Sequence, residues 1–420
     1  MKNLYAFYVR KIFHKGIKVF LYKRMLNGGI YMEFKFADRM SKIEEGIFTT
    51  LANIKKERYK EGKAVYDLSV GTPDFVPDRH VMDALIEAAE HTENYKYAIS
   101  DSDELLEAVK KWYKRRYKVD LEKDEIMSLY GSQEGLSRVA LTLCNPGDVV
   151  LVPNPGYPIF GIGPFLNDAK IEYYELREEN NYLIDFDSIP EDVAKKAKAM
   201  VVSYPANPIC RTAPKSFYEK LIAFAKKYNI AILHDNAYSE LVYDGKEGIS
   251  FLSIEGAKEV GIEFNSLSKS YNLTGCRISF AVGNKDLITQ FKKLRSQIDY
   301  GIFVPIQKAA IAALNGPQTS VERHRQEYED RRNALCDGLA EIGWKGAVSE
   351  GTMFVWAPLP KGYTNSEKFV LELIDKTGVF CVPGSVFGSL GEGYVRFALV
   401  KTVEEMKELV SVIKNSGIIK

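Results

Sequence analysis

Short apolar runs alternate with segments of helical periodicity from Ala64 to the C-terminus. The runs typical of buried strands include Val149–Val152, Ile171–Tyr174, Met200–Ser203 and Ile230–Leu233. The segments of helical periodicity include residues 102–118, Gln133–Leu143, Lys215–Tyr228, Val321–Leu339 and Val403–Lys414. Because apolar strands separated by helices are typical of a parallel sheet covered on both faces, the sequence predicts an α/β fold. Ligands of such sheets bind beyond the carboxyl ends of the strands, so polar residues there are candidates for function.

The composition excludes several classes of protein. The 420 residues are 46% hydrophobic and 27% charged, which predicts a soluble globular protein with a large domain and a smaller one. The formal net charge of +1 gives no electrostatic reason to expect nucleic acid as a partner. No apolar run approaches the roughly 20 residues of a membrane span, so we expect no membrane partner either.

The cysteines and histidines also carry information. Five scattered cysteines without a C-x-x-C pair predict reduced thiols and a cytoplasmic location. The five histidines lack the spacing of metal ligands, so we expect no metal site.

The first 31 residues differ from the rest of the chain. They contain seven basic residues and no acidic one: Lys2, Arg10, Lys11, Lys15, Lys18, Lys23 and Arg24. A targeting peptide and a surface-binding amphipathic helix are both open interpretations. We prefer a third, in which residues 1–31 are a basic extension upstream of the usual start at Met32.

One lysine stands between two strand-like runs, Val260–Phe264 and Ile278–Val282. Lys269 follows the hydroxyl residues Ser266 and Ser268, and Arg277 comes eight positions later. This pattern predicts an amine nucleophile beside an anion-binding cluster, although a surface loop with ordinary charges has the same composition.

Polar residues follow other predicted strands as well. Gly131-Ser132-Gln133 comes after the run Ile126–Leu129 and opens a helix, an arrangement that suits either a phosphate or a simple helix cap. Tyr157 lies in a proline-rich turn after Val149–Val152, where its ring can stack on a flat ligand or fill the end of the sheet.

At three further positions, burying the polar side chain costs free energy unless that side chain meets a partner. Asn207 lies between two prolines after a strand, and Asp235 ends the next strand with Tyr238 three residues later. A carboxylate there needs a cation or several donors, unless it caps a helix. Arg396, between Val395 and Phe397, is expensive unless it meets a carboxylate or a phosphate.

Taken together, these motifs resemble the class I/II aminotransferases, which depend on pyridoxal phosphate and have the aspartate-aminotransferase fold. The resemblance runs from about Met32 to the C-terminus, and Ser-x-Ser-Lys with Arg eight residues on matches the cofactor-attachment signature. The phrases HDNAYSELVYDG and EFNSLSKSYNLTG are similar to the subgroup of LL-diaminopimelate and alanine-forming aminotransferases.

The resemblance implies a particular α/β architecture. A large domain, residues 79–325, would bind the cofactor with a mostly parallel seven-stranded sheet flanked by helices. A smaller α+β domain would comprise residues 32–78 and 326–420. Residues 1–31 would be an extension outside both domains.

The resemblance also assigns catalytic roles. Lys269 would form the Schiff base with the cofactor aldehyde, the internal aldimine, and then move the proton at the substrate Cα. Asp235 would pair with the pyridinium nitrogen. Asn207 and Tyr238 would bond the phenolic oxygen of the ring, and Tyr157 would stack on its face.

Binding roles follow from the same resemblance. The phosphate would be held by Ser132, Gln133, Ser266, Ser268 and Arg277. Arg396 would bind the substrate α-carboxylate with help from Asn207 and the backbone at Gly71. Tyr97 resembles the tyrosine that reaches the phosphate of the partner subunit, which implies a homodimer with shared active sites.

The reaction implied is transfer of an amino group from an L-amino acid to a 2-oxo acid, with 2-oxoglutarate and glutamate as the expected couple. LL-diaminopimelate, alanine and aspartate are the candidate donors. A C–S β-lyase uses the same cofactor contacts and stays an alternative, as does, more remotely, a non-catalytic regulator-type relative. The S-x-x-K at Ser266–Lys269 and the K-T-G at Lys376–Gly378 also occur in penicillin-binding enzymes, but no S-D-N accompanies them.

Overall fold

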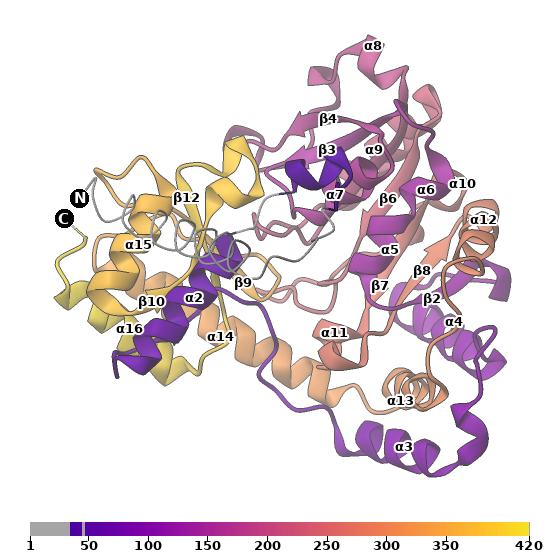
Figure 1. Ribbon diagram of the computed structural model, residues 1–420, viewed down its shortest axis with the longest axis horizontal. Helices are drawn as coiled ribbons and strands as arrows, with labels where there is room; N and C mark the ends of the chain where they lie inside the picture. Colours follow the sequence, from indigo (N-terminus) through magenta and orange to yellow (C-terminus); the bar gives the residue numbers. More distant parts are fainter. Residues whose placement is uncertain (1–33, 44–46, 420) are drawn as a thin grey trace, which may run out of the picture. The chain divides into compact units, whose positions relative to one another are not determined.

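A seven-stranded sheet is the largest sheet of the computed structural model, which describes residues 34–43 and 47–419 (Figure 1). Its strand order is β2-β8-β7-β6-β5-β3-β4. The strands are β2 (Ile126–Leu129), β3 (Val149–Asn154), β4 (Lys170–Glu175), β5 (Ala197–Ser203), β6 (Ala231–Asp235), β7 (Gly261–Ser266) and β8 (Ser279–Gly283). Strands β7, β6, β5, β3 and β4 run parallel, and β8 is antiparallel to both of its neighbours. The prediction of a mostly parallel seven-stranded sheet is confirmed.

Helices cover both faces of this sheet. Alternate residues of its strands point to opposite faces, and both sets are apolar and pack against helices. On β5, Val201 belongs to a core cluster that includes residues of α5, α7 and α12. Its neighbours Met200 and Val202 belong to a second cluster with residues of α4, α9 and α13. The continuous apolar runs in the sequence are therefore strands buried on both faces.

The helices of the described residues follow in chain order: α2 (Ile47–Lys60), α3 (Arg79–Glu90), α4 (Asp103–Tyr117), α5 (Ser132–Arg138), α6 (Ala140–Leu143), α7 (Ile159–Leu166), α8 (Glu191–Ala194), α9 (Lys215–Tyr228), α10 (Ala257–Val260), α11 (Leu267–Ser270), α12 (Lys285–Arg295), α13 (Val304–Asn315), α14 (Thr319–Glu341), α15 (Ser366–Thr377) and α16 (Val403–Asn415). Among them, none combines the length and apolarity that a membrane crossing requires.

Most predicted helices are confirmed within a residue or two of their ends. Helix α4 begins where the Ser102 hydroxyl accepts from the Leu105 N–H at 3.3 Å, which is a standard N-cap. The prediction of one helix over Gln133–Leu143 is wrong, because the structure divides it into α5 and α6 at Val139. Val139 keeps right-handed helical dihedrals (φ −59°, ψ −29°), so the break interrupts the hydrogen bonding without reversing the chain.

Smaller sheets lie among the C-terminal helices. Strand β1 (Tyr66–Asp67) pairs in parallel with β10 (Val379–Phe380). Strand β12 (Tyr394–Ala398) lies between β11 (Val382–Pro383) and β9 (Phe354–Pro358), antiparallel to both. Figure 1 shows the long helix α14 running toward this region. The elements are those of the expected smaller α+β domain, and the boundaries at residues 78 and 325 stay a prediction.

The chain divides into two compact units, Met1–Glu45 and Gly46–Lys420. The described part of the first unit contains one short 3-10 helix, η1 (Asp38–Lys42). The predicted basic extension, residues 1–31, lies outside the described residues.

Candidate active site

Polar residues gather where the parallel strands of the large sheet end. Asp235 is the last residue of β6 and pairs in register with Ser203, the last residue of β5. Lys269 lies in the short helix α11 directly after β7, and Asn207 follows β5 by four residues. Since β5, β6 and β7 are parallel neighbours, their carboxyl ends form one edge, as the sequence predicts.

Lys269 is held as a partly buried amine. The Ser266 hydroxyl caps α11 by accepting from the Ser268 N–H at 3.2 Å, which fixes the turn that carries the lysine. The Lys269 Nζ donates to the carbonyl oxygen of Gly71 at 2.5 Å. Burial, then Arg396, then Arg277 lower the pKa of Lys269 from 10.5 to about 8. A usable fraction of the amine is therefore neutral near pH 7–8, as a nucleophile requires.

Asp235 is a buried carboxyl group without a full set of partners. Its side chain is 6% exposed, and burial raises its pKa from 3.8 to about 7, although the N–H of Ala237 opposes the shift. The Oδ1 atom has no hydrogen-bond partner. The alternative of a helix cap is wrong, because residues 237–240 form a turn. An orphaned carboxylate oxygen fits a cationic N–H donor on a ligand.

Arg396 is a buried cation that meets no carboxylate among the contacts of the described chain. Its Nη1 donates to Asn207 Oδ1 at 2.7 Å and its Nη2 to the Ser69 carbonyl at 3.4 Å, while Nε is buried without a partner. The guanidinium lies 4.0 Å from the ring centre of Phe354 and 4.7 Å from that of Phe387. This arrangement leaves a positive charge for an anionic ligand. The Asn207 oxygen accepts from Arg396, and the NH2 group of Asn207 is the donor that this residue offers to a ligand.

Two tyrosines belong to the same site. Burial raises the pKa of Tyr157; Arg396 opposes the shift and Asp235 adds to it. Burial also raises the pKa of Tyr238 strongly, with the same two charged residues acting on it. Tyr238 is therefore a neutral phenol that can donate. Both tyrosines thus lie near the two charged residues, as the sequence predicts.

The predicted phosphate residues lie around the turn at Gly131. Gly131 has a φ of 92°, and a Cβ there would lie 2.2 Å from Nη2 of Arg277, so the turn requires glycine. Arg277 donates to the carbonyls of Thr274 (3.0 Å) and Tyr130 (3.3 Å) and is exposed. Gly131 is the N-cap of α5, without a side-chain cap hydrogen bond, and Ser132 is the first residue of the helix.

Gln133 extends this turn toward Tyr157. The Tyr157 hydroxyl donates to Gln133 Oε1 at 3.1 Å. The turn therefore presents hydroxyl, amide and guanidinium donors, which suit an anionic group.

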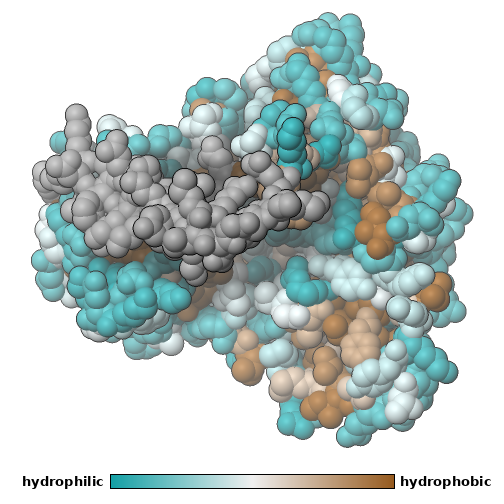
Figure 2. Space-filling view, in the orientation of Figure 1, coloured by the Kyte–Doolittle hydropathy of each residue, from teal (hydrophilic) through white to brown (hydrophobic). Residues whose placement is uncertain are grey.

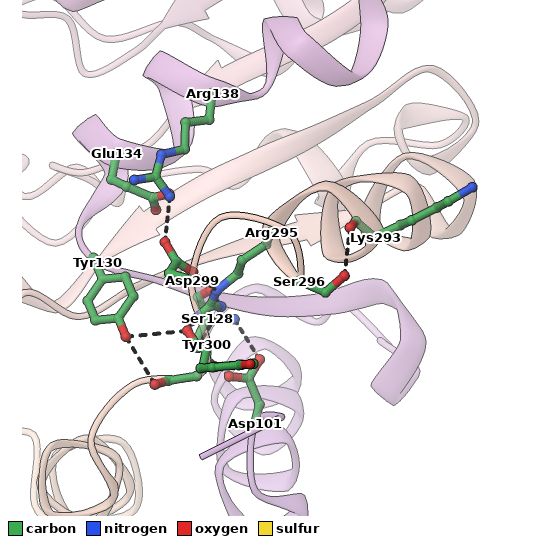
Figure 3. Close-up of polar contacts among 11 residues, drawn as sticks. Asp101, Ser128, Tyr130, Glu134, Arg138, Lys293, Arg295, Ser296, Asp299 and Tyr300 are labelled. Carbon is green, nitrogen blue, oxygen red and sulfur yellow. Dashed lines mark hydrogen bonds and ion pairs between the residues drawn. The ribbon is translucent and has the colours of Figure 1, made fainter. Parts of the chain in front are cut away.

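A polar network that the sequence did not reveal contacts the residues that lead into this turn (Figure 3). Arg295 of α12 donates to the carbonyls of Ser128 and Tyr300 and pairs with Asp299 at 3.0 Å. Arg138 of α5 also donates to Asp299, at 2.5 Å. The network joins the end of β2, which leads into Gly131, to the segment 295–301.

Tyr97 lies on the surface of the single chain. Its side chain is 80% exposed, and its ring centre lies 5.1 Å from that of Tyr300. The structure therefore does not gather Tyr97 with the buried residues of the site. Within the described residues, no group of three or more His, Cys, Asp or Glu side chains is placed to hold a metal ion.

The residues at the sheet edge fit pyridoxal phosphate. The orphaned Asp235 oxygen can accept from a protonated ring nitrogen, and the Lys269 amine can meet an aldehyde. The donors around Gly131 and Arg277 suit a phosphate, and Tyr157 offers a ring for stacking. One ligand thus accounts for groups that the chain alone leaves unpaired.

Comparison with known proteins identifies the family. The model of aminotransferase class I and II matches residues 63–413. The LL-diaminopimelate aminotransferases of Aquifex aeolicus and Halothermothrix orenii are 43% and 42% identical to the chain, over 91% of it and 99% and 98% of their own lengths. Substrate-bound BacF of Bacillus subtilis is similar in structure, with a TM-score of 0.87 and 35% identity over 91% of this chain and 98% of that one. A probable N-succinyldiaminopimelate aminotransferase from Thermus thermophilus has a TM-score of 0.83 and 32% identity over 88% of this chain and all of that one. The chain therefore belongs to the class I and II aminotransferases, and it is a pyridoxal-phosphate-dependent enzyme that transfers an amino group between an amino acid and a 2-oxo acid.

Proposed function

We propose that the amino donor is LL-diaminopimelate and the acceptor 2-oxoglutarate. The donor is suggested by the names of the two relatives above, which the chain matches over nearly their whole length. The acceptor follows from the resemblance set out in the sequence. Alanine and aspartate remain the competing donors.

The observation that carries the catalytic assignment is the partly buried amine of Lys269, with its pKa lowered to about 8, together with the unpartnered atoms Asp235 Oδ1 and Arg396 Nε. Bound pyridoxal phosphate supplies an aldehyde for an amine and a ring that accepts electrons. With the cofactor bound, Lys269 would hold its aldehyde and would carry the proton at the substrate Cα. Asp235 would accept from the protonated ring nitrogen, and this cationic partner would keep its carboxylate ionised.

The remaining residues bind and orient. Arg396 receives the substrate α-carboxylate, and the amide of Asn207, fixed by its bond to Arg396, donates toward the ring oxygen together with the Tyr238 hydroxyl. Tyr157 stacks on the ring. The backbone at Gly71 lies against Lys269 and completes the carboxylate site. The phosphate is bound by the residues that line the turns after β2 and β7: Ser132, Gln133, Ser266, Ser268 and Arg277.

We also propose a homodimer with shared active sites. Exposed apolar and aromatic side chains occur on α3, on residues 95–99 and on residues 298–303, and Figure 2 shows brown side chains over α3 and α13. Such surfaces mark contacts between proteins. Tyr97 lies in this area, with its ring tilted against that of Tyr300, and Tyr300 belongs to the network that contacts the phosphate turn. A second subunit here would bring its own Tyr97 toward the neighbouring phosphate.

A cytoplasmic location is part of the same proposal. All five cysteines of the chain are free, although Cys144, Cys210 and Cys381 are buried. Free thiols in this number suit a reducing compartment.

Borohydride reduction followed by peptide mapping tests the cofactor site. We expect a pyridoxyl group on the peptide that contains Lys269, and a different labelled lysine would contradict the assignment. A panel of amino donors with 2-oxoglutarate tests the substrate, with glutamate, pyruvate and ammonia measured. Glutamate formed fastest from LL-diaminopimelate supports the proposal. Faster turnover of alanine or aspartate, or pyruvate and ammonia from cystathionine, overturns it.

A further inference from the structure

One ion pair, between a buried arginine and an aspartate whose side chain is 35% exposed, anchors the chain segment that touches Lys269. Arg331 of α14 is 2% exposed and holds Asp74 through two parallel contacts, Nη1 to Oδ1 at 2.7 Å and Nη2 to Oδ2 at 2.9 Å. The same guanidinium donates to the Leu399 carbonyl at 2.9 Å and to Glu327 at 3.1 Å. A two-contact pair of this kind fixes orientation as well as distance.

Asp74 belongs to the segment Val70–Phe75, which passes over the proposed site. The carbonyl of Gly71 in this segment accepts from Lys269 Nζ at 2.5 Å. A Cβ at Gly71 would lie 2.4 Å from the ring of Phe354, and that ring also stacks on Arg396. The segment therefore contacts Lys269 directly, and it lies against the Phe354 ring that packs on Arg396.

Little else holds this segment. Residues 70–77 contain neither helix nor strand, and Val70 and the adjoining Val76 are exposed, Val76 by 74%. The backbone bond described within it is from the Thr72 N–H to the Val70 carbonyl. Phe75 adds one anchor, because its ring stacks on His324 at 4.3 Å and lies 4.6 Å from the Arg331 guanidinium. Both anchors of the segment thus converge on α14.

We propose that the ion pair between Asp74 and Arg331 positions the Val70–Phe75 segment over Lys269 and Arg396, and that it thereby sets the affinity for the amino-acid substrate. The inference rests on the roles proposed above for these two residues. Arg331 keeps three other partners when Asp74 is changed, so a substitution of Asp74 loosens the segment and leaves α14 in place.

The next residue of α14 provides a matched control. Arg332 holds Asp244 through two contacts of the same kind, at 2.6 and 3.2 Å. Asp244 belongs to the turn after Tyr243, away from the segment that carries Gly71. Asp74→Asn and Asp244→Asn therefore each remove the carboxylate that pairs with one of two adjacent arginines. Only Asp74→Asn changes the segment Val70–Phe75.

The experiment compares the two variants with the unsubstituted protein. Hydrogen exchange at the Thr72 amide, which makes the backbone bond described within the segment, should accelerate about tenfold or more in cofactor-free Asp74→Asn alone, because the charge pair that holds the segment is lost. With cofactor bound, KM for the amino donor should rise about tenfold in Asp74→Asn, while kcat changes by less than about threefold. Asp74→Glu, which keeps the charge, should recover part of the KM.

Several results would overturn the proposal. Exchange at the Thr72 amide that is unchanged, or equally fast in Asp244→Asn, would show that the pair does not hold the segment. Unchanged KM with accelerated exchange would show that the segment does not set substrate affinity. Should Asp74→Asn not fold, Arg331→Lys, which keeps the charge and loses the paired geometry, is measured in the same way. Borohydride labelling of Lys269 in the unsubstituted protein separates the two proposals, since its absence would refute the proposed function and its presence would leave only the positioning role under test.

Discussion

Two consecutive residues of β6, His234 and Asp235, belong to two different clusters of buried polar side chains, and the hydrogen bonding of the two clusters differs. His234 and Asp235 point to opposite faces of the strand. His234 Nδ1 lies 3.2 Å from Oε2 of Glu263, its register partner on β7, and both side chains are fully buried. Glu263 also accepts from three further donors, at 2.8–3.0 Å: the Tyr113 hydroxyl, the Ser250 hydroxyl and the Phe251 N–H.

The neighbouring cluster has the opposite property. Asp235 and Arg396 are as deeply buried, yet Oδ1 of the first and Nε of the second have no partner. Burying a polar group without a partner destabilises a fold, whereas a fully bonded group holds it together. The difference indicates that the His234–Glu263 cluster serves the fold and the Asp235–Arg396 cluster serves a ligand. Substitutions in each cluster should then affect different quantities.

The largest effect is expected for Lys269→Ala. Turnover should fall on the order of a thousandfold or more, because the variant loses both the amine that binds the cofactor and the base at the substrate Cα. The melting temperature of the cofactor-free variant should not fall. The lowered pKa of Lys269 means that the folded protein disfavours the charged amine, so removing this amine does not remove a stabilising charge. Steady-state kinetics and thermal unfolding measure the two quantities. Lys285→Ala, an exposed lysine on α12, is the control, and normal turnover in Lys269→Ala would refute the role.

Arg396→Ala should lower kcat/KM for amino acids and 2-oxo acids about a hundredfold. A charge-assisted contact to a carboxylate is worth about 1.5–3 kcal/mol, which the variant loses in the transition state. The free energy of unfolding of the cofactor-free protein should change little, because the guanidinium lacks a compensating carboxylate. Urea unfolding and kinetics on the same preparation test this contrast. Unchanged kinetics would place the carboxylate site elsewhere.

Glu263→Gln should give the reverse result. The amide cannot accept from all four donors, so the free energy of unfolding should fall by about 2 kcal/mol. We expect kcat to stay within about threefold of the original value. Glu191→Gln, which breaks an exposed pair with Lys195, is the control and should cost less than about 0.5 kcal/mol. A catalytic loss without a stability loss would contradict the division between the clusters.

Much of the fold could be predicted because its strands are buried on both faces. Runs such as Met200–Ser203 have no polar interruption, and the polar residues stand where the strands end. Asp235 and Lys269 could therefore be assigned to one edge of a sheet before their contacts were known. The resemblance then supplied roles that spacing alone does not give.

The pairings across the chain could not be predicted. Asp74 and Arg331 are 257 residues apart, and Arg396 reaches Asn207 across 189 residues. The sequence around each residue does not indicate its partner, because an arginine or aspartate in such a pair has the same sequence surroundings as an exposed, unpaired one. Glu263 stands as an acid within an apolar run, but its donors come from three separate segments. Only the packed structure shows which buried charge is compensated.

The smallest and most specific effect is expected from Asp235→Asn in the cofactor-free protein. The folded state holds the Asp235 proton up to about pH 7, whereas the unfolded chain releases it near 3.8, so the original protein loses stability as pH rises through this window. Asparagine has no proton to lose. Its advantage in melting temperature should therefore grow between about pH 4 and 7, reach roughly 2–4 °C and stay level above.

Thermal unfolding of both proteins at several pH values, with and without pyridoxal phosphate, measures this effect. With cofactor bound the sign should reverse, because the ionised Asp235 then meets a cationic ring nitrogen that asparagine cannot match. A melting-temperature difference that is independent of pH in the cofactor-free protein would contradict an uncompensated carboxylate at Asp235. A difference of the same sign in both forms would mean that the ligand does not complete the site, and the contrast with His234–Glu263 would be lost.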